Sequence, residues 1–331
     1  MDYLIVKTLA KAGIFNQKNK DNLTARINKK GKDDVVTEGD IQIGDLIIKG
    51  LLDQKRNVVV ESEEHGKQSN FQGDKREDVY YAIDDIDGSN NLRVGRGYLP
   101  YASMVVSFEK DNGSGDEPYK YSDYKEAACL DHLNQRIYYT QKGLGSVQIY
   151  DFDLNFLDEF KGRTQEDENL ALTLSTDIVS SNRGGNVGYA ASKKDDLPKN
   201  IVFPDRLSLV KLKYALCDSA SSVEEYGMVG IGVGDGYVSS GKKQHELPLL
   251  YAFASETGLE MTDFEGKSYA NKEYDFNGTG AEVICATPEV RKNIQDLIEQ
   301  QVKTNQKINT IFEAACAAKG IGYHKQDGID R

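Results

Sequence analysis

Residues that build disulfides, thiolate sites and covalent catalytic centres are scarce in this chain. Its 331 residues include only four histidines and four cysteines, and the cysteines (Cys129, Cys217, Cys285 and Cys316) lie far apart with no CxxC pair. Dispersed cysteines are typical of small buried side chains in a reducing cytosol, so we expect neither a disulfide framework nor a zinc site. The same scarcity argues against a covalent enzyme intermediate.

Long apolar runs are also absent. No window of the sequence approaches the roughly 18 apolar residues that a membrane span requires. The stretch from Met1 to Lys7 has no basic segment followed by a long apolar one, so it does not resemble a signal peptide. We therefore expect a soluble, cytoplasmic protein.

Positive charge is in deficit. The chain has 41 Lys and Arg against 53 Asp and Glu, which gives a formal net charge of −12. A surface of that sign repels a nucleic-acid backbone and an anionic membrane, so neither is expected as a partner. The surplus of acid raises the question of whether some carboxylates are present because they hold cations.

The remaining composition, 39% hydrophobic and 28% charged, is that of a globular protein long enough for one large domain or two lobes that share a cleft. Apolar spacing predicts helices at 2–16, 40–51, 219–230, 246–257 and 288–302. Strands are predicted at 57–61, 79–83, 101–109, 125–131, 136–141, 235–239 and 281–286. Loops are expected at 29–32 and 65–77, and an irregular polar segment at 150–195. The mixture indicates layered α+β or α/β packing.

Acidic residues collect at the ends of three of these elements. Glu61-Ser62-Glu63-Glu64 closes one predicted strand, Asp84-Asp85-Ile86-Asp87-Gly88-Ser89-Asn90-Asn91 closes another, and Asp40 begins a helix. If the two strands are neighbours in one sheet, several like charges come together, and their repulsion destabilises the fold. A divalent cation with oxygen ligands relieves that repulsion, and Mg²⁺ suits a few carboxylates together with waters and a phosphate.

A glycine directly follows the second acidic run. Gly88 lets the backbone approach a ligand closely, and free N–H groups at the start of a helix can hold a phosphate. Each feature alone has an ordinary alternative, because an acidic strand end is commonly a solvated edge and Asp-Gly-Ser is a common turn. The order and spacing of the three segments together indicate a metal and phosphate site.

In that order and spacing, the segments resemble the inositol monophosphatase superfamily of Mg²⁺-dependent, lithium-sensitive phosphomonoesterases. The family motif Asp-Pro-Ile-Asp-Gly-Thr-Thr-Asn matches 84–91, its Ser-Glu-Glu element matches 62–64, and its Asp-x-Val-Thr-x-x-Asp element matches 34–40. Further likeness at 142–145, 219–260 and 281–287 extends the resemblance over most of the chain.

The resemblance implies an α+β fold, a layered αβαβα sandwich of the sugar-phosphatase type, with two lobes and the active site between them. We expect an N-terminal α+β lobe at 1–190 that carries the main metal-binding motifs. A C-terminal α/β lobe at 191–331 would carry the last metal ligand and the substrate contacts.

The resemblance also implies the metal ligands. Glu63, Asp84 and the carbonyl of Ile86 would bind a first Mg²⁺. Asp84, Asp87 and Glu246 would bind a second.

Catalysis would use water, without a covalent enzyme intermediate. Glu63 and the Ser89 hydroxyl would orient a metal-activated water for direct attack on phosphorus. Asp40 and Glu63 would support a third, looser Mg²⁺ through waters. The implied substrate contacts are Asp87, Gly88, Ser89, Ala220, Ser221, Ser222, Ser239 and Glu246. For the run of small residues at 220–222, close helix packing is an equally good interpretation.

The chain departs from the family pattern at four places. His245-Glu246 stands where the family has Trp-Asp, and a Glu, one methylene longer, can still reach the second metal. His245 is a ligand, a proton carrier or, as we favour, a structural replacement for the Trp. Asp85 replaces a Pro and is expected to face solvent. Asn90 replaces the second Thr of the family motif, so that 87–91 is similar to the Asp-Gly-Ser-Ser-Asn of fructose-1,6-bisphosphatases. Ser239 replaces a Glu used by inositol-specific members, which argues against selectivity for inositol.

The predicted function is phosphomonoester hydrolysis on a small phosphorylated polyol, sugar or nucleotide, with two or three Mg²⁺ as cofactors. Inositol phosphate, fructose 1,6-bisphosphate and a 3′(2′),5′-bisphosphate nucleotide are the competing substrates. An alternative of another class is a degenerate, non-catalytic regulatory or scaffold protein. The family implies a homodimer, and the polar insertion at 150–185 either covers the cleft or forms oligomer contacts.

Overall fold

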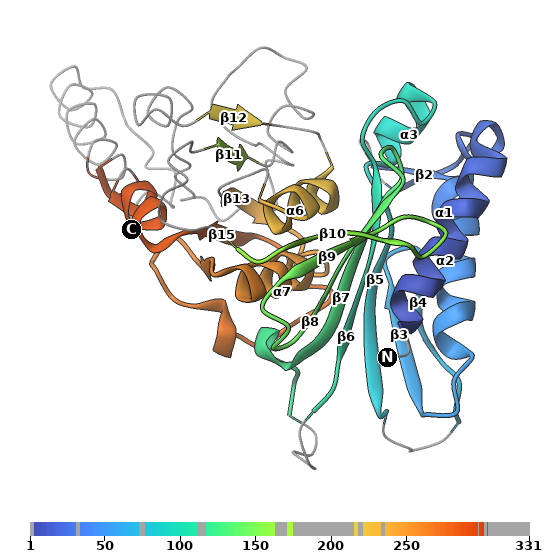
Figure 1. Ribbon diagram of the computed structural model, residues 1–331, viewed down its shortest axis with the longest axis horizontal. Helices are drawn as coiled ribbons and strands as arrows, with labels where there is room; N and C mark the ends of the chain where they lie inside the picture. Colours follow the sequence, from blue (N-terminus) through green and yellow to red (C-terminus); the bar gives the residue numbers. More distant parts are fainter. Residues whose placement is uncertain are drawn as a thin grey trace, which may run out of the picture.

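The computed structural model describes residues 3–30, 34–72, 77–110, 117–162, 171–174, 215–217, 221–232, 236–296, 298–300 and 303. These residues form an eight-stranded sheet, a five-stranded sheet and a two-stranded hairpin, with helices on both faces of the larger sheet (Figure 1). None of the helices in these ranges is both long enough and apolar enough to cross a membrane.

The large sheet is built by the N-terminal half of the chain. Its strands lie in the order β10 (Phe156–Phe160), β9 (Val147–Tyr150), β8 (Arg136–Gln141), β7 (Tyr124–Asp131), β6 (Ala102–Phe108), β5 (Val79–Asp87), β3 (Val58–Ser62) and β4 (Gly66–Ser69). β3 and β5 run parallel, whereas the other neighbours run antiparallel. Parallel strands end at the same edge of a sheet, so the acids that follow β3 and close β5 meet there.

The smaller sheet has the order β12 (Ala215–Cys217), β11 (Ala171–Leu174), β13 (Gly236–Lys242), β15 (Ala281–Ala286) and β14 (Glu260–Thr262). The hairpin of β1 (Arg26–Lys30) and β2 (Asp34–Thr37) leads directly into α2 (Glu38–Leu52). The remaining labelled elements are α1 (Leu4–Leu23), α3 (Ser89–Gly95), α6 (Ser222–Gly230), α7 (Leu247–Thr257) and the 3₁₀ turns η1 (Tyr121–Asp123) and η2 (Tyr269–Asn271).

The elements stack in layers. α1 and α2 cover one face of the large sheet, while α6 and α7 lie between its other face and the smaller sheet (Figure 1). The helical residues 288–296 lie beyond the smaller sheet and bury Val290 and Ile294. The arrangement confirms the predicted layered α+β fold with helices between two sheets.

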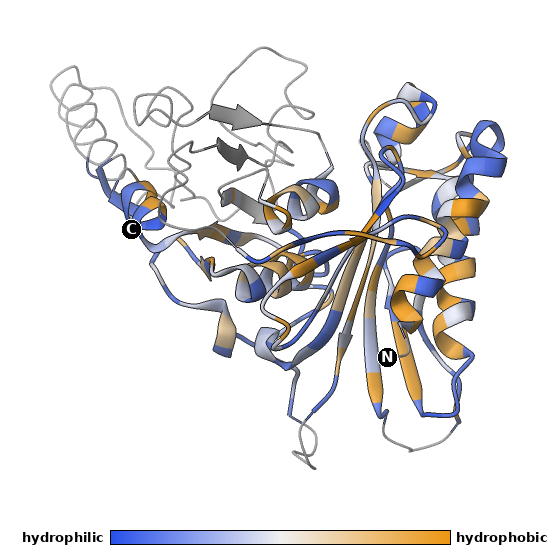
Figure 2. Ribbon diagram, viewed as in Figure 1, coloured by the Kyte–Doolittle hydropathy of each residue, from blue (hydrophilic) through white to orange (hydrophobic). Residues whose placement is uncertain are grey.

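Alternation along β5 divides the core in two. Tyr81 and Ile83 pack in the cluster under α1 and α2, whereas Tyr80 and Ala82 pack in the cluster that contains α6 and α7. Successive side chains of a strand point to opposite faces, so a strand buried on both faces reads as a continuous apolar run. Figure 2 shows hydrophobic residues along these strands and on the helices that cover them.

Most predicted elements are present, with differences at their ends. The first helix continues to Leu23, and β5 runs through the acids to Asp87 instead of ending at Ile83. The expected loop at 29–32 is wrong in part, because Lys29 and Lys30 pair in the β1–β2 hairpin. The expected loop at 65–77 contains β4, and the segment expected to be irregular holds β10 and β11. The predicted helix at 288–302 is helical at 288–296 and 298–300.

The chain changes from the large to the small sheet between β10 and β11, since β11 already belongs to the smaller sheet. The predicted lobe boundary at residue 190 lies outside the described residues, as does much of the 150–185 insertion. The boundary stays a prediction.

A buried carboxylate joins the large sheet to α7. Glu256, near the end of α7, accepts hydrogen bonds from the backbone N–H groups of Gly143 (2.9 Å) and Gly145 (2.6 Å) and from the Tyr124 hydroxyl. Gly143 and Gly145 have φ of 79° and 71°, so the turn between β8 and β9 needs glycine at both positions.

We expect Glu256→Ala to lower the free energy of unfolding by about 2–4 kcal/mol, because it leaves two N–H groups and a phenol without their charged acceptor. The measurement is urea unfolding followed by circular dichroism. Glu265→Ala is the control, since the Glu265 side chain is 66% exposed, and it should change stability by less than about 0.5 kcal/mol. Equal effects of the two substitutions would show that the Glu256 contact is not structural.

Candidate metal centre

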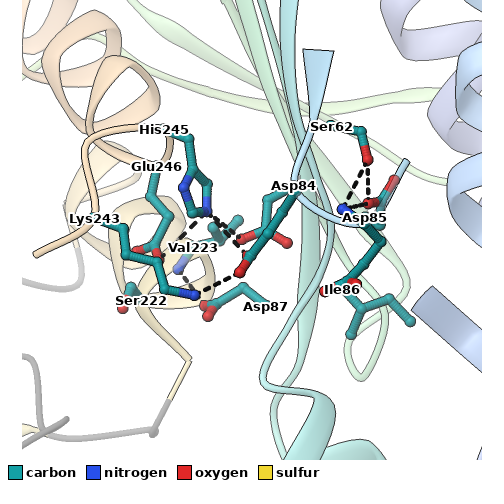
Figure 3. Close-up of polar contacts among 12 residues, drawn as sticks. Ser62, Asp84, Asp85, Ile86, Asp87, Ser222, Val223, Lys243, His245 and Glu246 are labelled. Carbon is teal, nitrogen blue, oxygen red and sulfur yellow. Dashed lines mark hydrogen bonds and ion pairs between the residues drawn. The ribbon is translucent and has the colours of Figure 1, made fainter. Parts of the chain in front are cut away.

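Acidic side chains from both halves of the molecule come together between the sheets. Glu63, Asp84 and His245 have ligand atoms that all lie within 4.8 Å of one another, and Asp84, Asp87 and Glu246 form a second such group. Asp84 belongs to both groups, so two neighbouring cation sites would share its carboxylate. Figure 3 shows His245 and Glu246, just before α7, facing Asp84 and Asp87 of β5.

The backbone of β5 explains why Asp84 and Asp87 share a face. Residues three apart in a regular strand point to opposite faces, but the pairing of β5 with β6 shifts register between Asp84 and Asp87. Ile86 accordingly packs on the α1 and α2 side together with Ile83. The bulge turns Asp87 back toward Asp84 and Glu246.

Gly88 makes the turn that follows. It has φ of 87° at the N-cap of α3, and a Cβ there would lie 3.2 Å from both the Pro100 carbonyl oxygen and the Ser221 Cβ. Only glycine fits this conformation and this space without strain. The turn carries the chain from Asp87 into Ser89.

Asp87 is held by the start of α6. Its Oδ2 accepts hydrogen bonds from the Ser221 hydroxyl (2.9 Å) and the Val223 backbone N–H (2.8 Å). Burial and the nearby Glu246 raise the pKa of Asp87 to about 7, against the favourable charge of Lys242. Burial also raises the pKa of Asp84 well above its usual range, although His245 opposes the shift. The centre therefore lacks enough positive charge for its carboxylates.

Two lysines supply part of that charge: Lys242, the last residue of β13, and Lys243, which follows it. Lys243 Nζ lies 2.5 Å from Glu63 Oε1. The buried Lys242 donates to the Ser222 hydroxyl, and its Nζ lies 3.7 Å from Glu246 Oε2. Burial alone would raise the pKa of Glu63, but the close charged contact with His245 and the hydrogen bond and charge of Lys243 outweigh it and hold that pKa below its usual range.

A pocket of about 280 Å³ opens beside the first group of ligands. It is lined by Glu61, Ser62, Glu63, Gly66, Lys243, His245, Phe276, Asn277, Gly278 and Thr279. The pocket gives a small molecule access to Glu63 and His245.

Asp40 and Ser89, two of the residues assigned to catalysis from the sequence, contact each other. The Ser89 hydroxyl is 2.6 Å from Asp40 Oδ1 and 3.0 Å from the Ile86 carbonyl oxygen. Asp40 Oδ2 accepts from the Thr37 N–H (2.7 Å) and closes a capping box at the start of α2. Burial raises the pKa of Asp40 to about 6. Among the described residues Asp40 belongs to neither ligand group, so its part in a third metal site stays a prediction.

His245 does more than replace an apolar residue. Its ring stacks on Phe276 with 5.3 Å between centroids, as a structural residue would. Its Nε2, however, lies 3.3 Å from Glu63 Oε2 and 3.5 Å from Asp84 Oδ2. The favoured interpretation as a purely structural replacement is therefore incomplete. The sequence signal was the position of this histidine beside the acid that aligns with a metal ligand.

The expectation that Asp85 faces solvent is wrong. Asp85 is fully buried: its Oδ2 accepts from the Ser62 hydroxyl (2.5 Å) and the Glu64 N–H (3.3 Å), and its Oδ1 lies 3.5 Å from His65 Nδ1. The reason is that β5 continues past Ile83, so alternation turns Asp85 toward α2 while Asp84 turns toward α7 (Figure 3). Gly44 of α2 leaves the space that Asp85 and His65 fill.

The predicted substrate contacts in the C-terminal half have mixed outcomes. Ala220 lies outside the described residues. Ser221 contacts Asp87, and Ser222 contacts Lys242. Ser239 is buried in β13, opposite Val283. Their contacts with a substrate stay predictions.

Known structures share this fold. No protein-family model matches the sequence, and the comparison with curated proteins gives no match. The fold matches an IMPase of Thermotoga maritima at a TM-score of 0.59 and 17% identity, over 90% of this chain and 96% of that one. It also matches an inositol monophosphatase-fructose 1,6-bisphosphatase with a TM-score of 0.61 and 18% identity, over 90% of this chain and 100% of that one.

A third match is an IMPase/NADP phosphatase complexed with Mg²⁺ and phosphate, with a TM-score of 0.60 and 15% identity over 89% of this chain and 94% of that one. The chain therefore has the inositol monophosphatase fold, as the sequence motifs predict.

We expect Gly44→Ala to destabilise the protein by about 1–3 kcal/mol, because its new methyl group would collide with Asp85 Oδ1 and His65 Cε1. In an ordinary helix interior the same change stabilises by about 1 kcal/mol, so the sign is diagnostic. Lys49→Ala, at an exposed position of α2, is the control in the same denaturant titration. A stabilised Gly44→Ala variant would contradict the packing described for Asp85.

Without divalent cations, the protein should lose stability as the pH rises from about 4 to about 7. The pKa of Asp87 is raised from 3.8 to about 7, so the folded state binds the proton more tightly than the unfolded state across this window. Asp87→Asn should remove part of that loss, and at pH 8 in EDTA it should be more stable than wild type by at least about 1 kcal/mol. Asp158→Asn, at an exposed position of β10, is the control and should show the same dependence of stability on pH as the wild type. If Asp87→Asn also shows the wild-type dependence, the prediction is refuted.

Proposed function

We propose that this protein is a divalent-metal-dependent phosphomonoesterase that acts on a small phosphorylated metabolite. The observation that carries the proposal is the carboxylate of Asp84, buried and shared by two adjacent groups of potential ligands. Paired cation sites of this kind suit phosphoryl hydrolysis, in which negative charge develops on both the attacking and the leaving oxygen.

The donors fit divalent cations. The pKa values of Asp84 and Asp87 are raised, which is the state expected of buried carboxylates with too little positive charge around them. We assign Glu63, Asp84 and the Ile86 carbonyl to one divalent cation, and Asp84, Asp87 and Glu246 to a second. When bound, the cations supply a more acidic water and neutralise charge on the phosphate.

The residues around the cations position the reactants. Asp40 fixes the Ser89 hydroxyl at 2.6 Å, so Ser89 and Glu63 are the residues that orient the attacking water. The N–H groups of Gly88 and Ser89 would hold phosphate oxygens at the turn into α3. Lys243 adds positive charge at the pocket through which a phosphate would enter.

The pocket and the proteins with the same fold support the proposed substrate class. A pocket of about 280 Å³ accepts a metabolite but not a folded macromolecule. Structures with this fold include an inositol monophosphatase-fructose 1,6-bisphosphatase and an IMPase/NADP phosphatase. We propose Ser221, Ser222, Ser239 and Glu246 as the residues near the non-phosphate part of the substrate.

Phosphate release from a panel of inositol 1-phosphate, fructose 1,6-bisphosphate, 3′-phosphoadenosine 5′-phosphate and NADP tests the proposal. Release should require a divalent cation, be suppressed by lithium, and fall at least about 100-fold in Asp87→Asn. Glu246→Asp should preserve or raise activity, because it restores the shorter acid of the family motif.

Asp158→Asn is the matched control for Asp87→Asn and should keep wild-type activity. Full activity of Asp87→Asn, or activity in EDTA, would refute the proposal. Binding of cations without turnover of any substrate in the panel would instead identify a non-catalytic protein.

A further inference from the structure

The His245 imidazole is directed into the carboxylate cluster. The residue is 3% exposed, and its Nε2 forms no hydrogen bond. Three carboxylate oxygens nevertheless surround that nitrogen, at 3.3 Å from Glu63, 3.5 Å from Asp84 and 3.8 Å from Glu246. The nitrogen is buried among carboxylates, and none of them is aligned to accept its hydrogen bond. Ligand atoms placed around one metal ion have this arrangement.

A role as a counter-ion to Glu63 and Asp84 accounts for only part of this arrangement. Lys243 already neutralises Glu63 at 2.5 Å, and a counter-ion would direct its N–H along one carboxylate lone pair. The ring is also fixed from behind by its stack on Phe276. Fixed orientation of an imidazole is what a metal ligand requires.

We propose that His245 Nε2 is a ligand of the first cation site, together with Glu63 and Asp84, and that this site selects a divalent first-row transition ion over Mg²⁺. Imidazole nitrogen favours transition ions, whereas Mg²⁺ takes oxygen ligands. The second site, formed by Asp84, Asp87 and Glu246, has oxygen donors only and keeps the preference for Mg²⁺. The inference uses the centre assigned under the proposed function, but it concerns the donor atoms and not turnover.

The test is direct metal binding by the full-length protein. Metal-free protein is titrated with Co²⁺ in the presence of excess Mg²⁺, followed by its visible absorption, and Mn²⁺-loaded protein is examined by pulsed electron paramagnetic resonance for coupling to a histidine nitrogen. We expect one Co²⁺ per chain that excess Mg²⁺ does not displace, and a nitrogen coupling on Mn²⁺.

His245→Gln replaces the nitrogen donor with an amide oxygen. It should weaken Co²⁺ binding at least about tenfold, leave Mg²⁺ affinity nearly unchanged and abolish the nitrogen coupling. His132→Asn, which removes another buried histidine that stacks on Tyr101, is the matched control and should retain both signals. His245→Asn replaces the Gln variant if that variant does not fold, as judged by its thermal unfolding.

An unchanged ratio of Co²⁺ to Mg²⁺ affinity in the variant, or a nitrogen coupling that survives it, overturns the inference. Neither result depends on phosphate release. An inactive protein with the nitrogen coupling would refute only the proposed function, and an active one without the coupling would refute only the ligand assignment.

Discussion

The central physical constraint on this structure is the mutual repulsion of carboxylates that are brought together, away from water, between two sheets. Asp84 and Asp87 belong to β5, and Glu63 directly follows β3, the parallel neighbour of β5. Glu246 directly precedes α7, which packs against the large sheet from the side of the smaller one. Like charges at such distances in a buried place destabilise the fold unless a cation or a proton compensates them. Lys242, Lys243 and His245 compensate in part. Burial and the neighbouring carboxylates still keep the pKa values of Asp84 and Asp87 raised.

The fold holds these charges in place from both ends of one helix. α7 begins directly after Glu246, and near its other end Glu256 is bound by the turn between β8 and β9. That turn belongs to the same sheet as β5. The hydrogen bonds to Glu256 therefore anchor the far end of α7 to the same sheet that carries Asp84 and Asp87.

Sequence reasoning found the parts of the site that depend on local order. The acids at the ends of two strands were expected to converge if those strands are neighbours in one sheet, and β3 and β5 are neighbours and run parallel. It failed for Asp85, because its burial depends on the length of β5 and on the gap at Gly44 in another element. The contact of Ser221 with Asp87 and the transfer of the chain to a second sheet at β11 are long-range in the same way. No local pattern encodes them.

The pair His245-Glu246 shows how two departures from a motif fit one centre. Glu246 occupies the N-cap position of α7 but makes no capping hydrogen bond. An aspartate at an N-cap readily turns back to the N–H groups of the first turn, whereas the longer glutamate carries its carboxylate past them toward Asp84 and Asp87. The preceding histidine directs a nitrogen to the other side of Asp84. The Asp84 carboxylate thus lies between a group of ligands with oxygen atoms only and a group that also contains a nitrogen. Two cations bound there would not be equivalent.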